Sequence, residues 1–435
     1  VYGQDNVIDE VVWVVGDEAI LKSDVENERL NAQYEGRKFD GDPYCIIPEQ
    51  LAIQKLFLHQ AAIDSIEVSE QEIISDVERR TNWLIDQIGS KEKVEEYYNK
   101  TSTQIREMLR ENIRDGKTVQ KMQQQIVGDI KITPAEVRRY FKDLPQDSIP
   151  FIPTQVEVQI ITMEPKIPQE EIERVKKTLR DYTERVTSGE IAFSTLARLY
   201  SEDEGSRRRG GELGFMGRAE LVPEYANVAF NLQDPNKVSK IVESEFGFHI
   251  IQLIEKRGDR INTRHILLKP KVDEKDLEAA LLRLDSIAND IRNEKFTFDD
   301  AATYISHDKD TRNNHGLMAN PQTGTARFEM QQLAQVSQEA AKMVEGMNVG
   351  EISKPFTMIN AKGKEICAIV KLKTRLNGHK ATITEDYQRL KGIVMEKRSE
   401  EKLDKWIKDK QKHTYVRINE KWQKCDFKYP GWVKK

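Results

Sequence analysis

The stretch from Phe193 to Leu253 constrains the fold of this chain more than any other. Its first part predicts an amphipathic helix, because Phe193, Leu196, Ala197 and Tyr200 recur at helical spacing. A polar turn with Asp203 follows, and the glycine-rich run at 210–214 requires backbone that bends sharply or packs closely. The stretch ends in a strand-like run at 247–251, where one face would carry His249 and the other its aliphatic neighbours. Helix and strand therefore mix within this segment.

A second copy of the same plan follows in the chain, which predicts two repeats at 154–257 and 261–373. The strand-like run that contains Gln159 matches the one that contains His265, and the turn acid Asp203 matches Asp308. The two strand residues are separated by one residue more than the two turn acids. Val238-Ser239-Lys240 likewise recurs as Ile352-Ser353-Lys354.

The order of motifs in the first repeat resembles the parvulin family of peptidyl-prolyl isomerases. The matching segments are Ser201-Glu202-Asp203, Gly210-Gly211-Glu212-Leu213-Gly214, Val222-Pro223-Glu224-Tyr225 and Gly247-Phe248-His249-Ile250-Ile251. The resemblance implies an α+β domain that rotates X-Pro bonds without a cofactor, a metal or a covalent intermediate. It implies a proline-binding pocket at Leu221, Tyr225 and Phe230, with Asp203 and His249 beneath the substrate amide.

Each repeat departs from the family pattern at one histidine. In the first repeat, Gln159 stands where the family has its first strand histidine, and an amide could still hydrogen-bond to an imidazole. In the second, His265 and Asp308 are present but Ala368 replaces the closing histidine, so these two are expected to be vestigial. The residues leave open whether isomerase activity survives the Gln159 replacement.

Residues 1–153 predict a mainly helical domain with a proline-containing linker. A hairpin is expected at 11–22 around Gly16-Asp17, and helices at 48–66, 69–88, 104–127 and from Thr133. A capping box is expected at Ser23, and Ser69 and Thr133 are expected to cap the starts of their helices. A helix at 384–412 and a strand at 415–418 return near the end of the chain. Because one helix and one strand cannot form a core, residues 379–435 should pack on the amino-terminal domain, with their strand beside the hairpin.

The composition of the chain argues against two classes of function, nucleic-acid binding and membrane insertion. Sixty-eight Lys and Arg against 73 Asp and Glu give a net charge of −5, which offers no positive field for nucleic acid. No apolar run approaches the roughly 18 residues that would span a bilayer, so no membrane insertion is expected. The start at Val1 rather than Met suggests a processed or trimmed terminus. Of the cysteines, Cys45 and Cys425 could form a disulfide in an oxidising compartment or be two unrelated thiols.

Two further features have ordinary explanations. The run Arg207 to Arg209 is interpreted as a solvated loop, and His307 and His315 near Asp308 lack the additional ligands that a metal site needs.

The whole layout resembles the SurA-type periplasmic chaperones of outer-membrane proteins. This resemblance implies an α+β multidomain protein of the periplasm whose partners are unfolded polypeptides, especially outer-membrane proteins. Long apolar helix stripes bordered by charge would hold extended clients, and the repeats would add peptide contacts. The alternative is an active foldase that isomerises X-Pro bonds, and a third possibility makes the repeats mere spacers.

Overall fold

The computed structural model describes residues 9–434, which form two compact units. One unit joins the chain up to Gln146 to the chain from Thr382 onwards, and the other comprises Asp147–Ala381. Val1, the predicted processed start, lies outside the described residues. No helix within residues 9–434 is long and apolar enough to cross a membrane.

A three-stranded antiparallel sheet in the first unit joins amino-terminal and carboxy-terminal segments. β1 (Val11–Val15) lies between β2 (Glu18–Leu21) and β13 (Val416–Ile418), with Trp13 opposite Ile418. The predicted hairpin and its pairing with the returning strand are thus confirmed.

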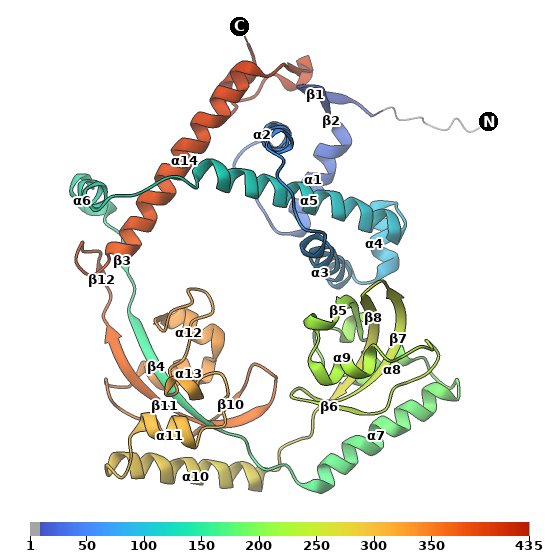
Figure 1. Ribbon diagram of the computed structural model, residues 1–435, viewed down its shortest axis with the longest axis vertical. Helices are drawn as coiled ribbons and strands as arrows, with labels where there is room; N and C mark the ends of the chain where they lie inside the picture. The colour runs from blue at the N-terminus through green and yellow to red at the C-terminus, as the bar shows by residue number, and fades with distance from the viewer. Residues whose placement is uncertain (1–8, 435) are drawn as a thin grey trace. The chain divides into compact units, whose positions relative to one another are not determined.

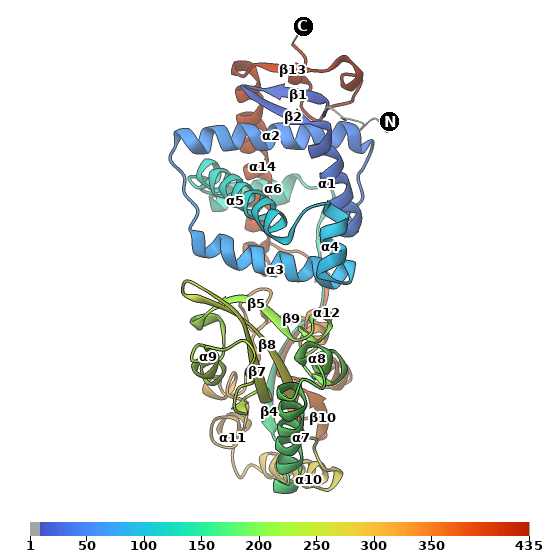
Figure 2. The ribbon, with the colours of Figure 1, turned by 90° about the vertical axis from the view of Figure 1, so that its right-hand side faces the viewer.

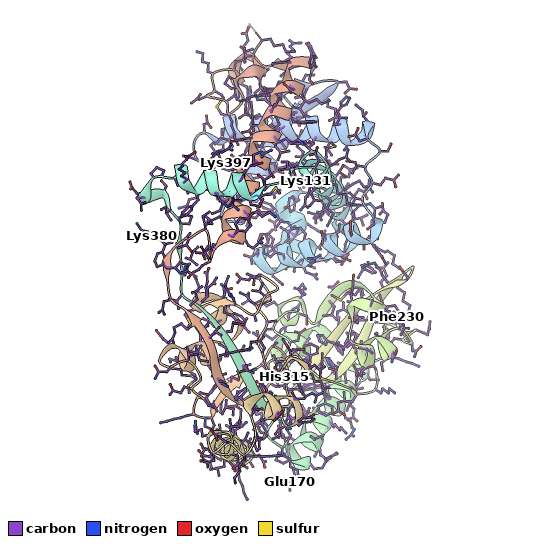
Figure 3. The ribbon with its side chains drawn as sticks, turned by 60° about the vertical axis from the view of Figure 1, so that its left-hand side comes forward. Lys131, Glu170, Phe230, His315, Lys380 and Lys397 are labelled. Atoms are coloured by element: carbon purple, nitrogen blue, oxygen red, sulfur yellow. A yellow bond between two sulfur atoms is a disulfide. The ribbon has the colours of Figure 1, made fainter. Side chains whose placement is uncertain are left out.

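Helices complete the first unit (Figures 1 and 2). They are α1 (Lys22–Tyr34), α2 (Pro43–Ile63), α3 (Glu70–Ile88), α4 (Lys91–Tyr98), α5 (Ser102–Val127), α6 (Pro134–Asp143) and α14 (Tyr387–His413). The predicted caps Ser69 and Thr133 are confirmed, since each side chain accepts a backbone N–H of the first turn. α14 packs on α6, where the Lys397 ammonium lies 5.5 Å from the Tyr140 ring centroid (Figure 3).

Two helix starts differ from the prediction. α1 is capped at Leu21 rather than at Ser23, and the Asp24 carboxylate accepts the Leu21 N–H at 2.9 Å. α2 begins at Pro43 rather than at Pro48, because Asp42 caps it and proline fits the first helical position, where no N–H is needed.

The apolar stripes of α3 and α5 face each other inside the first unit. Their buried residues form one cluster with Val94 of α4, which comprises Ile73, Val77, Leu84, Val94, Ile105 and Leu109. The expectation that such stripes are exposed for clients therefore needs correction. These apolar surfaces are buried where α5 packs against α3, and α5 also contacts α2 (Figure 2).

An aromatic core fixes the carboxy-terminal segment to this unit. The Trp13 ring meets Phe427 and Trp432 edge-on, with centroids 5.3 and 5.4 Å away. The buried Glu49 carboxylate of α2 accepts hydrogen bonds from Tyr429 N at 3.0 Å and Trp432 Nε1 at 2.7 Å. Cys45 and Cys425 form a disulfide beside this core, which decides between the two alternatives for these thiols.

The second unit contains two four-stranded antiparallel sheets (Figure 1). One has the order β5 (Glu212–Gly217), β8 (Arg260–Leu268), β7 (Gly247–Arg257), β6 (Val242–Ser244). The other has the order β10 (Phe356–Ile359), β11 (Glu365–Leu376), β4 (Gln155–Met163), β9 (Phe328–Glu329). A short ribbon pairs β3 (Phe151–Ile152) with β12 (His379–Lys380).

The two sequence repeats exchange their first strands. β4 opens the first repeat but pairs with β11 of the second, and β8 opens the second repeat but pairs with β7 of the first. The repeats at 154–257 and 261–373 are therefore not the two sheets seen in space.

A hairpin at Gly258-Asp259 explains the exchange. Arg257 pairs with Arg260 across this two-residue loop, and Gly258 has a positive φ of 60°, as the first loop position of a tight hairpin favours. Such a loop can only return the chain to the neighbouring antiparallel position. β8 therefore takes the place beside β7, and β4 must pair elsewhere.

Helices cover both sheets, and we name the resulting domains by their composition. The histidine domain, residues 164–268, carries α7 (Gln169–Thr187) and α8 (Phe193–Tyr200) on one face of its sheet and α9 (Pro223–Ala229) on the other. The split domain combines residues 155–163 with 269–376. Its helices are α10 (Glu274–Arg292), α11 (Phe298–Tyr304), α12 (Met330–Val336) and α13 (Gln338–Glu345).

Candidate active site

Four side chains form a continuous hydrogen-bonded chain across the histidine domain. Asp203 Oδ2 lies 2.7 Å from His265 Nε2, and His265 Nδ1 lies 3.0 Å from His249 Nδ1. His249 Nε2 in turn lies 2.6 Å from Ser244 Oγ. The two imidazole rings are stacked, with centroids 5.2 Å apart. We call this set the histidine relay.

The carboxylate fixes the direction of the first hydrogen bond. An ionised Asp203 can only accept, so His265 donates to it from Nε2. A neutral His249 ring donates from one nitrogen and accepts at the other, so its bonds to His265 and Ser244 run in one of two orders, set by its tautomer. Both nitrogens of each imidazole have a hydrogen-bond partner.

The surroundings of the relay favour these protonation states. Burial and the neighbouring His265 lower the pKa of His249 from 6.5 to about 3, so its ring stays neutral. Burial works against the charged form of Asp203, but hydrogen bonds from His265 and Ser206 outweigh it and lower the carboxyl pKa well below 3.8. Ser206 Oγ lies 2.6 Å from Asp203 Oδ2.

Backbone contacts hold the Asp203 turn against β8. Ser201 Oγ accepts the Leu267 N–H at 3.2 Å, and Glu202 N donates to Leu267 O at 2.7 Å. Gly211 has a φ of 85°, and a Cβ there would lie 2.3 Å from the His265 carbonyl oxygen. Only glycine allows this approach, which explains one glycine of the run at 210–214.

The expected proline pocket lies beside the relay. The buried Tyr225 ring meets His249 and His265 edge-on, at centroid distances of 5.5 and 5.6 Å, and its hydroxyl pairs with Thr263 Oγ1 at 2.8 Å. Burial raises the pKa of Tyr225, so the hydroxyl stays protonated. Leu221 and Phe230 are half-buried in the same cluster, and Figure 3 marks Phe230.

The structure does not bring Gln159 to this cluster. Its side-chain amide donates to Asp299 Oδ1 at 2.6 Å and to the His315 carbonyl oxygen at 2.9 Å, both in the split domain. The expectation that Gln159 faces His249 needs correction, because β4 pairs with β11 rather than with β7. Similarly, His265 is no vestigial residue of a second site but the first histidine of the relay.

The match of Gln159 to His265 in the sequence analysis is also off by one residue. Gly211 lies against His265, and its counterpart Gly316 lies against Ile160. Ile160, not Gln159, therefore occupies the position in β4 that His265 has in β8. This shift accounts for the one-residue difference in spacing that the sequence contained.

The split domain keeps the shape of the site but not its histidines. Asp308 accepts a hydrogen bond from Thr311 Oγ1 at 2.6 Å, as Asp203 does from Ser206. Ile160 and Ala368 replace the two imidazoles, and both belong to the apolar core that faces α12 and α13. Asp308 thus remains where a relay acid would stand, without a relay.

Sequence reasoning missed the partnership of His265 and His249 and the role of Ser244 as the last relay member. The signal was present, since Gly258-Asp259 lies between two alternating strands, as Gly16-Asp17 does. The second Gly-Asp falls in the gap between the predicted repeats at 154–257 and 261–373.

Comparison with known proteins finds one domain family twice in this chain. Residues 160–255 and 265–374 match the rotamase family, described as a PPIC-type PPIase domain. The Chaperone SurA of Aliivibrio fischeri is 24% identical over 438 residues, which cover 94% of this chain and 92% of the relative. The chain is thus similar to SurA-type chaperones over almost its full length.

Further SurA-type similarity comes from Salmonella paratyphi A, whose Chaperone SurA is 25% identical over 72% of this chain and 75% of its own. Among solved structures, one of two SurA-like chaperones of Campylobacter jejuni covers 94% of this chain and 99% of its own, at a TM-score of 0.31 and 8% identity. Foldase protein PrsA of Streptococcus pneumoniae covers 90% and 89%, at a TM-score of 0.24 and 12% identity. Both matched rotamase regions follow the order of the chain, whereas the two sheets exchange the first strands of these regions.

Proposed function

We propose that this protein is a chaperone for unfolded exported polypeptides whose histidine domain isomerises X-Pro bonds. The observation that supports isomerase activity best is the complete relay of Asp203, His265, His249 and Ser244 beside Tyr225. The relay supports the foldase alternative more strongly than the sequence does, because β8 supplies the strand histidine that the first repeat lacks.

The chemistry asked of such a site is modest. Rotation about an X-Pro bond crosses a barrier of about 20 kcal/mol because it breaks amide resonance. A catalyst must hold the proline ring on an apolar surface and leave the twisted amide poorly solvated. In this proposal Leu221, Tyr225 and Phe230 hold the ring, while the hydrogen-bonded relay provides rigid dipoles beside the carbonyl. No proton needs to leave the relay.

Client binding would involve the first unit as well. A cavity of about 870 Å³ there is lined in part by side-chain amides, which include Asn27, Asn31, Gln54, Gln104 and Asn112. Carboxylates and two lysines line the rest of its polar wall. Amides both donate and accept hydrogen bonds, so they suit the main chain of an extended polypeptide of any sequence. Leu51, Leu58 and Met108 add apolar surface to the same cavity.

The finer assignment to outer-membrane clients and to the periplasm is part of this proposal. It is supported by the similarity to Chaperone SurA and by the Cys45–Cys425 disulfide, since such bridges persist in oxidising compartments. Extended outer-membrane strands would fit a cavity that recognises main-chain groups.

One experiment tests both parts in the full chain. We expect the double variant His249→Ala/His265→Ala to lose isomerisation of an X-Pro tetrapeptide by at least about tenfold, because fixed hydrogen-bonding groups beside a reacting carbonyl contribute at least that much to the rate. The same variant should still suppress aggregation of an unfolded outer-membrane protein. Wild-type protein without isomerase activity would refute the catalytic part, and wild-type protein that fails to suppress aggregation would refute the chaperone part.

A further inference from the structure

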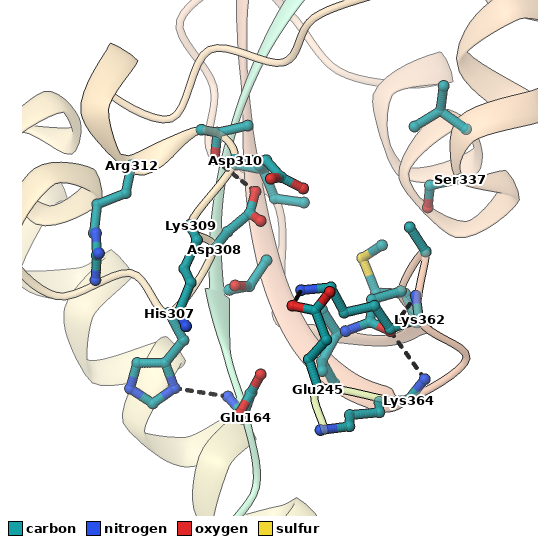
Figure 4. Close-up of a pocket in the computed structure, with 18 of the residues that line it drawn as sticks. Glu164, Glu245, His307, Asp308, Lys309, Asp310, Arg312, Ser337, Lys362 and Lys364 are labelled. Carbon is teal, nitrogen blue, oxygen red and sulfur yellow. Dashed lines mark hydrogen bonds and ion pairs between the residues drawn. The ribbon is translucent and has the colours of Figure 1, made fainter. Parts of the chain in front are cut away.

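The split domain contains a cavity of about 980 Å³ at the place where the histidine domain has its relay. Ile160, Met318, Met358 and Ile366 line it with apolar surface, and Asp308 and Thr311 add polar groups. Figure 4 shows Asp308 among the lining residues. Because Ile160 and Asp308 correspond to His265 and Asp203, this cavity is the counterpart of the relay site. The replacements have removed imidazoles and left an apolar floor.

The cavity also reaches the histidine domain. Val222 and Pro223 at the start of α9 line it, and so does Ser244 in β6. Ser244 is the last member of the relay, with its hydroxyl 2.6 Å from His249 Nε2. One residue therefore belongs both to the cavity wall and to the hydrogen-bonded chain of the candidate active site.

Charges of both signs surround the apolar floor. Glu245 and Lys362 form an ion pair at 2.5 Å, which joins the turn before β7 to the turn before β11 (Figure 4). Glu164, Asp310, Lys309 and Lys364 also line the cavity. An apolar floor with a mixed charged rim matches an apolar side chain on a polypeptide better than a small ligand of single charge.

We propose that this cavity binds a segment of the unfolded client next to the X-Pro bond that the histidine domain isomerises. This inference rests on the proposed function and assigns a separate task to each of the two domains. The histidine domain rotates the bond, and the split domain holds an apolar side chain of the same extended chain. Methionines suit this task because their unbranched side chains adapt to different partners.

Val336 allows a test with little effect on folding. It lines the cavity, yet its side chain is 42% exposed and contributes little to the core. Val336→Asp would place a charge on the apolar surface. Ile359→Asp is the matched control, because Ile359 adjoins the cavity residue Met358 in β10 but is 53% exposed and does not line the cavity.

The assay compares a short X-Pro tetrapeptide with an unfolded protein whose refolding is limited by proline isomerisation. We expect Val336→Asp in the full chain to raise KM for the protein substrate about tenfold, as loss of one buried aliphatic contact allows. Its kcat and the turnover of the tetrapeptide should stay unchanged, and Ile359→Asp should change neither. An unchanged KM for the protein substrate, with both substrates turned over, would overturn the inference.

A binding measurement separates this inference from the proposed function. In the His265→Ala background, anisotropy measures the affinity for a fluorescent, reduced and carboxymethylated protein that cannot fold. Adding Val336→Asp should weaken that affinity several-fold, and adding Ile359→Asp should not. If wild-type protein isomerises neither substrate, the proposed activity fails, and this measurement still decides whether the cavity binds unfolded chains.

Discussion

His249 Nδ1 and His265 Nδ1 lie 3.0 Å apart although the two residues belong to different copies of the sequence repeat. Each copy lacks one of the two histidines and has the one that the other copy lacks. The residues that stand in place of the missing histidines, Ile160 and Ala368, both lie in the split domain. The exchange of strands therefore concentrates both histidines in one domain and leaves the other without either.

The segment that folds on its own should be one that contains a complete sheet with its helices, not one that matches a sequence repeat. We expect a fragment of residues 164–272 to fold alone, because it contains all four strands β5 to β8 and the helices that cover them. A fragment of residues 154–257 lacks β8 and with it the central strand beside β7, so it should stay largely unfolded. Circular dichroism and urea unfolding of both fragments measure this. Cooperative unfolding of the 154–257 fragment alone would contradict it.

Substitutions of Gln159 and His265 should change the isomerase activity in the opposite way to what the sequence predicts. His265→Asn should reduce isomerase activity at least about tenfold, because it breaks the relay between Asp203 and His249. Gln159→His should not raise the activity. It should instead destabilise the split domain by about 1–3 kcal/mol, since a buried amide loses its bonds to Asp299 and the His315 carbonyl. A higher isomerase rate for Gln159→His would show that residue 159 belongs to the active site.

Much of this architecture follows from local patterns. The caps at Ser69 and Thr133, the hairpin at Gly16 and the return of the terminal strand to β1 were predicted because each depends on a few neighbouring residues or on one unsatisfied apolar surface. Asp203 and His249 were found for the same reason, since they stand in short motifs. The partner of His249 could not be found this way. Which strand fills the central position depends on the competition between β4 and β8, and the two-residue turn at Gly258 decides it.

The Cys45–Cys425 disulfide should stabilise the first unit alone. It joins positions 380 residues apart, and closing a long loop lowers the entropy of the unfolded chain. Replacing both cysteines by alanine should cost about 2–5 kcal/mol of unfolding free energy. Tryptophan fluorescence reports this cleanly, because all five tryptophans (Trp13, Trp83, Trp406, Trp422 and Trp432) lie in the first unit.

Cys367→Ala is the control for that experiment, since this free cysteine lies in the split domain. Reduction of the wild-type protein should lower the fluorescence-detected midpoint as the double replacement does. Equal midpoints for oxidised and reduced protein would show that the amino-terminal and carboxy-terminal segments hold together without the bond.

The relay should make the histidine domain less stable as the pH falls below neutrality. Folding lowers the pKa of His249 from 6.5 to about 3, so between these values the unfolded chain binds a proton that the folded domain excludes. Stability contributed by this residue is complete above pH 6.5 and is lost as the pH falls towards 3. The expected slope is at most about 1.4 kcal/mol per pH unit. Asp203 acts in a lower window, because its folded pKa lies below 3.8 and its contribution is lost only under more acidic conditions.

The measurement is pulse proteolysis of the full chain in urea at pH 7.0, 6.0, 5.0 and 4.5, with cleavage within residues 164–268 followed by mass spectrometry. His249→Gln removes the titrating group, so the difference in unfolding free energy between wild type and variant should shrink as the pH falls through this range. Titrating groups outside the relay contribute to both proteins and cancel in that difference. His59→Gln is the matched control, because this exposed histidine lies in the first unit and its replacement should leave the pH dependence of residues 164–268 intact. A difference between wild type and His249→Gln that stays constant from pH 7.0 to 4.5 would mean that folding does not lower the pKa of His249, and that its ring is not held neutral.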